Sequence, residues 1–131
     1  MSLIDELLSL EITPPVDTVK IGGKPVSVGG ILNPTQMARL TKEGQGRKNL
    51  PVQIGEELVQ LDEIEVQAYL WLIAGWQDAV KPTFEEIVTL SRKTGLDCMN
   101  AGQRVMELSG MLADEVDAVK NGSGEAVTLA P

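Results

Sequence analysis

The stretch LDEIEVQAYLWLIAGWQDAV, from Leu61 to Val80, has an apolar centre in which no residue between Ala68 and Trp76 carries a charge. A helix without a polar face is typical of the buried centre of a domain or of a membrane span. A span needs about 20 apolar residues, and this uncharged run is less than half that length. The stretch therefore predicts a central buried helix and no membrane segment, with Trp71 and Trp76 in the core rather than at an interface.

The ends of this helix are marked by local signals. Asp62 and Glu65 have the spacing of a capping box, and Pro82 lies just beyond the apolar run. We expect a helix over residues 62–79.

Two further helices are predicted downstream. Thr83 and Glu86 repeat the capping spacing and Gly95 is a stop signal, which predicts a helix over 84–94. A last helix is expected over 97–119, and residues 120–131 read as a flexible tail. The last helix carries an apolar stripe at steps of three and four: Cys98, Ala101 or Gly102, Val105, Leu108, Leu112 and Val116.

The N-terminal part combines a short helix with a hairpin. Ser2 and Asp5 form a third capping pair before closely spaced leucines, and the proline pair at 14–15 is a stop, so a helix is expected over 3–11. Alternating valines and isoleucines around a Gly-Gly-Lys-Pro turn predict a hairpin over 16–30.

One more helix is expected between the hairpin and the central stretch. Asn33 is a cap, Pro34 suits the first helical position, and Gly44 is a stop, so this helix should cover 34–43. Residues 44–55 are expected to form a loop or a loose extended segment. The whole pattern predicts a mainly α, single small domain over 1–119 with an N-terminal β-hairpin.

The sequence RVMELSGMLADE places Ser109 and Gly110 inside the predicted last helix. A glycine within a helix costs about 0.5–1 kcal/mol relative to alanine. A small pair at this place lets another backbone come close, so packing against a neighbouring element can offset that cost.

The sequence gives little support for an enzymatic function. The chain has no histidine and one cysteine, Cys98, so it contains no disulfide, no Cys/His zinc site and no histidine general base. Ser109 and Ser123 lie outside any nucleophile turn. The acids at 62–65 and 85–86 fall at helix starts, where a negative charge interacts favourably with the helix dipole. The acids at 114–117 are expected on an exposed face. We expect a protein that is not an enzyme, with no cofactor and no metal.

The charge distribution disfavours nucleic acid. The net charge is -8, and binding to phosphate backbones depends mainly on Lys and Arg. A small basic island, formed by Arg39, Lys42, Arg47 and Lys48, leaves open the alternative of a small nucleic-acid-binding regulatory or adaptor protein. A third option is an enzyme that uses carboxylates and magnesium.

Two stretches carry a family resemblance. RVMELSGM resembles the closing helix of the tail assembly chaperones of long-tailed, lambda-like siphoviruses, in which an apolar pair followed by Leu-Ser-Gly-Met recurs. AYLWLIAGWQD is similar to the central helix of that family, and the order of hairpin, short helix, apolar helix and terminal helix is also similar. The resemblance covers most of residues 16–112. The short tail without a long acidic run and the early leucine-rich helix depart from the lambda pattern.

The resemblance implies a non-enzymatic assembly factor of a phage or prophage, active in the host cytoplasm. Its partners would be the tape-measure protein, which it keeps soluble, and the tail-tube protein, which it helps to recruit. It also implies homo-oligomers and a longer form of the same chain made by ribosomal frameshifting. A holdase of this kind needs net charge for solubility and an apolar surface for its partner.

The apolar candidates for a partner or self-association surface fall into two groups. The first is Leu3, Ile4, Leu7 and Leu8 on the first helix. That helix has too few residues to be stable alone, so it must pack on the protein's own core, which is the commoner case, or on a partner. The second lies around the small pair and consists of Leu108, Ser109, Gly110, Met111 and Leu112.

Overall fold

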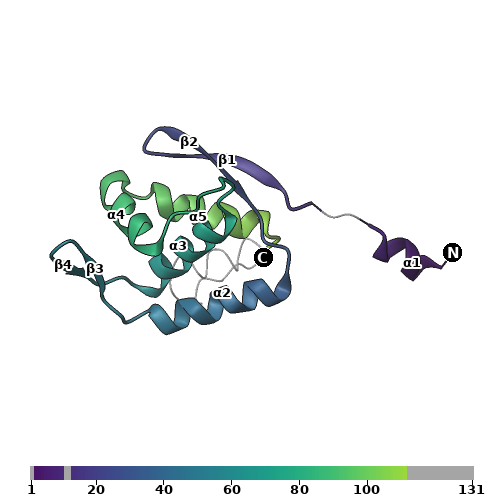
Figure 1. Cartoon of the computed structure of the whole chain (residues 1–131), viewed down its shortest axis with the longest axis horizontal. Helices are drawn as coiled ribbons and strands as arrows, with labels where there is room; N and C mark the ends of the chain where they lie inside the picture. The colour runs from purple at the N-terminus through teal and green to yellow at the C-terminus, as the bar shows by residue number, and fades with distance from the viewer. Residues whose placement is uncertain (1, 11–12, 112–131) are drawn as a thin grey trace, which may run out of the picture.

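Helix α3 (Glu63–Gly75) lies at the centre of the protein, between helix α5 (Asp97–Leu108) on one side and helix α2 (Pro34–Arg47) on the other (Figure 1). The computed structural model describes residues 2–10 and 13–111. The remaining elements are α1 (Leu3–Leu8), β1 (Val16–Ile21), β2 (Lys24–Gly29), β3 (Val52–Ile54), β4 (Glu57–Val59) and α4 (Phe84–Thr94). The prediction of a mainly helical fold with an N-terminal hairpin is confirmed.

Helix α3 begins as predicted but ends earlier. The Asp62 side chain accepts a hydrogen bond from the Glu65 backbone N–H at 2.9 Å, and the Glu65 carboxylate accepts one from the Asp62 N–H at 3.3 Å. The expected end at residue 79 is wrong, because Trp76 adopts an extended conformation and forms a β-bridge with Val28. Pairing with the edge of strand β2 replaces further helical hydrogen bonds.

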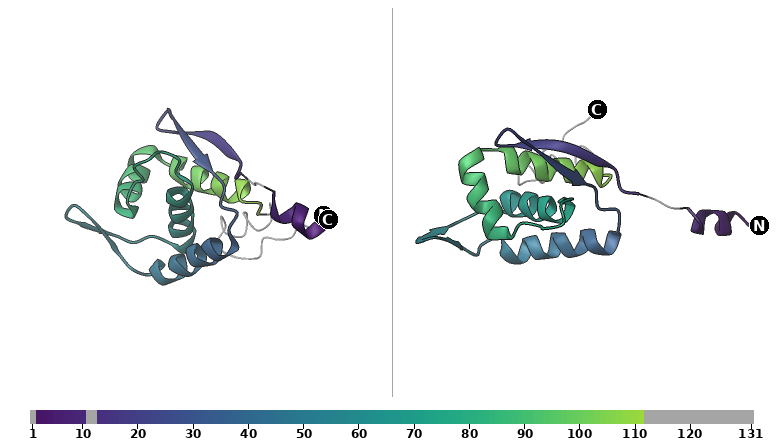
Figure 2. Two further views of the ribbon diagram at one scale, coloured as in Figure 1. Left: turned by 45° about the vertical axis from the view of Figure 1, so that its right-hand side comes forward. Right: turned by 45° about the horizontal axis from the view of Figure 1, so that its top comes forward.

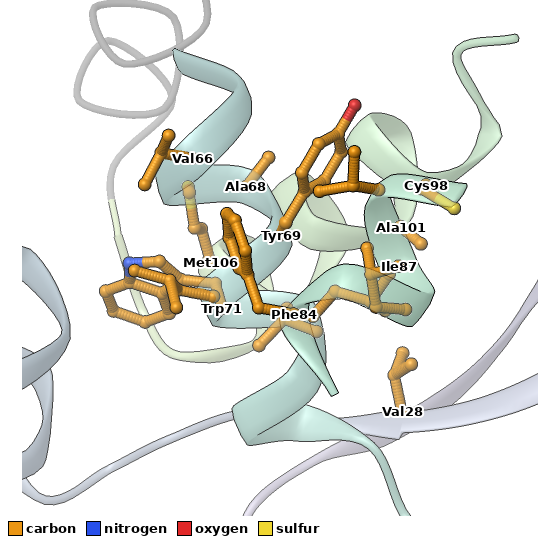
Figure 3. Packing of buried hydrophobic residues seen from close by; sticks show 14 of the residues in the cluster. Val28, Val66, Ala68, Tyr69, Trp71, Phe84, Ile87, Cys98, Ala101 and Met106 are labelled. Carbon is orange, nitrogen blue, oxygen red and sulfur yellow. The ribbon is translucent and has the colours of Figure 1, made fainter. Parts of the chain in front are cut away.

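The core is formed mainly where α3 and α5 meet. A Cβ on Gly102 would collide with the Ala68 backbone carbonyl, so the two helices touch with no side chain between them at this point. Around this contact pack the buried residues of α3, α4 and α5 (Figure 3), among them Tyr69, Trp71, Phe84, Ile87, Cys98, Ala101 and Met106. The two tryptophans differ: Trp71 is buried, and Trp76 is half-buried.

Helix α2 corrects the expectation for residues 34–43. Its Asn33 cap is as predicted, but it continues to Arg47 through Gly44. Gly44 is buried, and a Cβ there would collide with the carboxamide of Gln67, which donates a hydrogen bond to the Thr41 carbonyl at 3.1 Å. The glycine is needed for close packing of α2 on α3 and does not end the helix.

The loop or loose extended segment expected over 44–55 is helical at its start, where α2 continues to Arg47, and forms strand β3 at Val52–Ile54. Strands β3 and β4 form a second antiparallel hairpin, in which Val52 pairs with Val59 and Ile54 with Glu57. Gly55 has a positive φ of 63° at its turn. The hairpin forms because Val52, Ile54 and Val59 pack against the core while the intervening residues face solvent.

The first hairpin is confirmed. Strands β1 and β2 pair antiparallel with Val16 opposite Gly29 and Ile21 opposite Lys24, and the turn residues Gly22 and Gly23 both have positive φ. The hairpin lies along α5 (Figure 2). Its turn is attached to the start of that helix, since the Gly22 N–H donates to the Asp97 carboxylate at 2.9 Å.

Helix α4 has the predicted bounds. The Thr83 hydroxyl accepts a hydrogen bond from the Glu86 N–H at 3.1 Å, and the Glu86 carboxylate accepts one from the Thr83 N–H at 2.8 Å. Gly95 follows the helix with a φ of 68°. Because all these signals are local, they could be read from the sequence.

The last helix is shorter than predicted, since α5 ends at Leu108 and not at residue 119. Gly110 has a φ of 89°, its N–H donates to the Glu107 carbonyl at 3.0 Å, and the Met111 N–H donates to the Met106 carbonyl at 3.3 Å. This is a Schellman motif, in which a left-handed glycine terminates the helix. Residues 112–119 and the predicted tail at 120–131 lie outside the described part of the chain.

A close backbone approach does occur beside Ser109, but Gly110 is not its cause. A Cβ on Gly30 would collide with the Leu108 carbonyl, whereas the space around Gly110 is open. The buried Ser109 hydroxyl donates to the Val105 carbonyl at 2.6 Å and accepts from the Ile31 N–H at 2.7 Å. It therefore links the end of α5 to the chain that leaves β2.

Gly102→Ala should lower the free energy of unfolding by about 1–3 kcal/mol, because the new methyl group meets backbone that cannot rotate away. Gly46→Ala is a matched control, since Gly46 is also helical but faces open space. This control should stabilise the protein by up to about 1 kcal/mol. Urea denaturation of both variants tests the contact, and equal effects would contradict it.

Ser109→Ala should lower the free energy of unfolding by about 1–3 kcal/mol, since it leaves the buried Ile31 N–H without its acceptor. Thermal melting measures the loss. Ser27→Ala, at an exposed serine of β2, should change stability by less than about 0.5 kcal/mol. A melting temperature for Ser109→Ala equal to that of the control would contradict the assigned hydrogen bond.

Candidate interaction surfaces

Helix α1 presents the largest exposed apolar cluster in the described chain. Its four large apolar side chains are between 51% and 76% exposed, and no residue of the helix is buried. They are the predicted Leu3, Ile4, Leu7 and Leu8, and the exposed Leu10 follows them. The predicted end at residue 11 is wrong, because the described helix stops at Leu8 and Ser9 takes the C-cap position.

The local sequence explains why α1 forms. The Ser2 hydroxyl accepts a hydrogen bond from the Asp5 N–H at 3.3 Å, which starts the helix. Asp5 and Glu6 lie in its first turn, where acidic side chains interact favourably with the helix dipole. A helix of six residues is nevertheless too short to be stable in water by itself. In both figures α1 lies away from the rest of the protein (Figures 1 and 2), so its apolar face is available to another molecule.

The second predicted surface belongs to the fold. Leu108 and Met111 are half-buried against the core, and Ser109 is buried. Gly110 is exposed but carries no side chain. Leu112 lies outside the described residues. The described residues of this segment close α5, and the apolar side chains among them, Leu108 and Met111, are partly exposed.

A third surface was missed by the sequence reasoning. An open groove of about 680 Å³ lies between α4, the turn of the second hairpin and residues 76–82. We call it the α4 groove. Its apolar lining is Ile54, Trp76, Val80, Pro82, Ile87 and Leu90, and its charged rim is Asp78, Lys81, Glu85, Glu86 and Lys93. Nothing in the sequence indicated this groove, because its walls come from separate segments and the second hairpin, which forms one of them, was not predicted.

Two of the charged rim groups already have partners. The Lys81 ammonium donates to the Ala74 carbonyl at 2.8 Å, and the Glu86 carboxylate accepts from the Thr83 N–H. Lys93 forms no ion pair with any described residue. The groove therefore combines an apolar lining with a rim on which three acidic residues, Asp78, Glu85 and Glu86, outnumber the two lysines, Lys81 and Lys93.

Cys98 has the properties of a core residue. Its side chain is fully buried, and burial raises the pKa of the thiol above its ordinary value of 9.0. A higher pKa means less thiolate at neutral pH, which is the opposite of what a nucleophile needs.

The acidic residues form no ligand cluster in the described chain. Asp62, Glu65 and Glu86 serve as helix caps. Among residues 2–10 and 13–111, no group of three or more His, Cys, Asp or Glu side chains is placed to hold a metal ion. The acids at 114–117 lie outside these residues.

The basic island is spread along α2. Arg39, Lys42 and Lys48 are exposed, but the Arg47 guanidinium lies over the Phe84 ring at 4.6 Å and helps to hold α2 near α4. Lys48 also lines a hollow with the acidic start of α3. Glu43 and these acids interrupt the basic surface, which does not favour the phosphate backbone of a nucleic acid.

No helix of the described chain is both long and apolar enough to cross a bilayer. Comparisons with models of known protein families, with curated proteins and with solved structures found no match. The functional interpretation therefore depends on the exposed surfaces and on the resemblance seen in the sequence.

Cys98 should react with a thiol reagent such as DTNB only when the protein opens. At pH 8 the native protein should react far more slowly than the same protein in denaturant, in which all thiols are accessible. Native labelling at the rate of a free thiol would contradict the burial.

The same thiol predicts the pH dependence of stability. Since the pKa of the thiol is raised in the folded state, its contribution to the free energy of unfolding is complete below pH 9.0. That contribution is lost as the pH rises through the higher folded value. Cys98→Ala should reduce this alkaline loss. Urea midpoints measured for both proteins at pH 7 and pH 10 test it.

Proposed function

We propose that this protein is a phage or prophage tail assembly chaperone, which binds the tape-measure protein in the host cytoplasm and keeps it soluble. The observation that carries the proposal is helix α1, whose apolar face is exposed and has no partner in the described chain. The family resemblance of the central and closing helices supplies the identity of the partner.

The physical basis is helix docking. Leu3 and Leu7, and likewise Ile4 and Leu8, are four residues apart and so lie on neighbouring positions of the helix surface. An amphipathic helix of this kind binds an apolar groove or another amphipathic helix. A long helical protein offers many equivalent sites of that type, so many copies of a small chaperone can cover it.

Solubility is the second requirement of such a chaperone, and net charge provides it. The net charge of -8 keeps the chaperone and its complexes apart from one another by repulsion. Recruitment of the tail-tube protein and a frameshifted longer form are further parts of the proposal, and both come from the resemblance alone. The proposed role is non-enzymatic, in keeping with a buried thiol and with acids that cap helices.

The proposal is tested by co-expression with the tape-measure protein of the same tail gene cluster. The wild-type chain should keep that protein in the soluble fraction and co-purify with it. The double variant Leu3→Asp/Leu7→Asp should weaken binding by about tenfold or more, since each fully buried leucine contributes about 1.5–3 kcal/mol.

Leu50→Asp is the matched control, because Leu50 is exposed to a similar extent but lies outside α1. It should bind like the wild type. Equal binding by all three proteins would show that α1 is not the contact surface, and a wild-type chain that neither binds nor solubilises the tape-measure protein would rule out the proposed function.

A further inference from the structure

The α4 groove is an apolar surface that no described residue covers. Helix α4 lies beside the second hairpin (Figures 1 and 2), and residues 76–82 form the third wall. Val80 is 83% exposed, and Ile54, Trp76 and Leu90 keep part of their surface in contact with water. Because small-molecule sites enclose most of their ligand, an open groove is better suited to a segment of another protein.

The rim of the groove favours a cationic segment. Its three acids and two lysines give it a formal charge of -1. Four of these five groups are placed at helix ends, where the dipole offsets part of their charge: Glu85, Glu86, Lys81 and Lys93. The fifth, Asp78, lies between α3 and α4 and forms no ion pair with any described residue. The charge that nothing offsets is therefore negative, as is the net charge of the chain.

Trp76 adds an aromatic group that can bind a cation. Its side chain lines the groove and is half-buried. A Lys or Arg over a tryptophan ring is attracted by the charge distribution of the ring, and Trp and Arg are both enriched among the residues that dominate interface energies. Within the described chain a cation–π contact joins Arg47 to Phe84, and none involves Trp76. The ring is therefore available to a cation of a partner.

The groove runs along α4, which determines the length of segment that it can hold. Glu85, Thr89 and Lys93 line it at four-residue intervals, so one face of α4 forms its wall. The eight steps from Glu85 to Lys93 correspond to about 12 Å at 1.5 Å per residue, or about two turns of helix. Because the acids lie at the start of α4 and Lys93 lies in its last turn, basic residues of a partner are favoured near the first turn.

We infer that the α4 groove binds a basic amphipathic helix of another protein. Apolar side chains of that helix contact Trp76 and Leu90, and a Lys or Arg faces Asp78 and Glu85. Apolar contact provides most of the affinity, and the charges set the direction. The groove shares no residue with α1, so the inference does not depend on the proposed contact with the tape-measure protein.

A synthetic peptide of about 15 residues, with leucines at helical spacing and lysines on the other face, tests the inference. Trp76 emission should shift to shorter wavelength as the peptide covers the ring, with a Kd of about 10–100 µM. A peptide with glutamate in place of each lysine should bind at least about tenfold more weakly. The lysine peptide with a central proline should also lose about tenfold, because proline breaks the helix.

A charge variant and a matched control locate the contact. Asp78→Lys/Glu85→Lys reverses the rim, whereas Glu43→Lys/Glu63→Lys makes the same change in net charge at exposed acids outside the groove. Glu63 lies in the first turn of α3 as Glu85 does in α4, so the cost to the helix dipole is matched. The rim variant should bind the lysine peptide about tenfold or more weakly, and the control less than about threefold. Circular dichroism and melting temperature check that both variants are folded.

Two further variants separate the groove from other surfaces. Trp76→Phe should abolish the emission change, because the remaining Trp71 is buried, and calorimetry should show weaker binding. Leu3→Ser/Leu7→Ser removes apolar contact area from α1 and should bind the peptide like the wild type.

Other outcomes would overturn the inference. Equal loss of affinity in the rim variant and its control would show that net charge alone attracts the peptide. Equal binding of the glutamate or the proline peptide would exclude a basic or a helical occupant. Loss of binding in Leu3→Ser/Leu7→Ser would place the peptide on α1, and no binding up to about 1 mM would show that the groove is not a docking site. None of these results involves the tape-measure protein, so the proposed function is tested separately.

Discussion

The fold depends on the contact between the backbones of α3 and α5 at Ala68 and Gly102. Because no side chain separates the helices there, the neighbouring side chains interdigitate, and Val105 and Met106 reach the core under α3. The first hairpin then covers α5 and α2 covers α3 from the other side. A core with few aromatic residues can be closely packed in this way, since short interhelical distances replace large side chains.

Local signals in the sequence were sufficient for the starts of most helices, whereas two glycines, Gly44 and Gly110, were misread. The capping pairs Asp62–Glu65 and Thr83–Glu86 act within one turn, so neighbouring residues alone define them. Gly44 looked like a stop and is a packing position, and Gly110 looked like a packing position and is a stop. A glycine permits both close approach and positive φ, and only the tertiary structure distinguishes the two uses.

Long-range contacts explain the remaining errors. The second hairpin is stabilised by packing of its alternate residues on the core, and Trp76 leaves the helix because its backbone pairs with β2. The core residues under the second hairpin and the β2 residue that pairs with Trp76 are both distant in sequence. For the same reason the α4 groove could not be foreseen, while the exposed leucines of α1 could, because their pattern lies within a single turn-and-a-half of helix.

The left-handed residue at Gly110 has a consequence for how the chain tolerates change. Gly110 completes the hydrogen bonds at the C-terminal end of α5, and the Ser109 hydroxyl attaches that helix end to Ile31. The helix is therefore terminated and fixed at the same place. A residue with a Cβ at position 110 would have to adopt the same left-handed conformation, so this position accepts fewer residue types than an ordinary helix terminus.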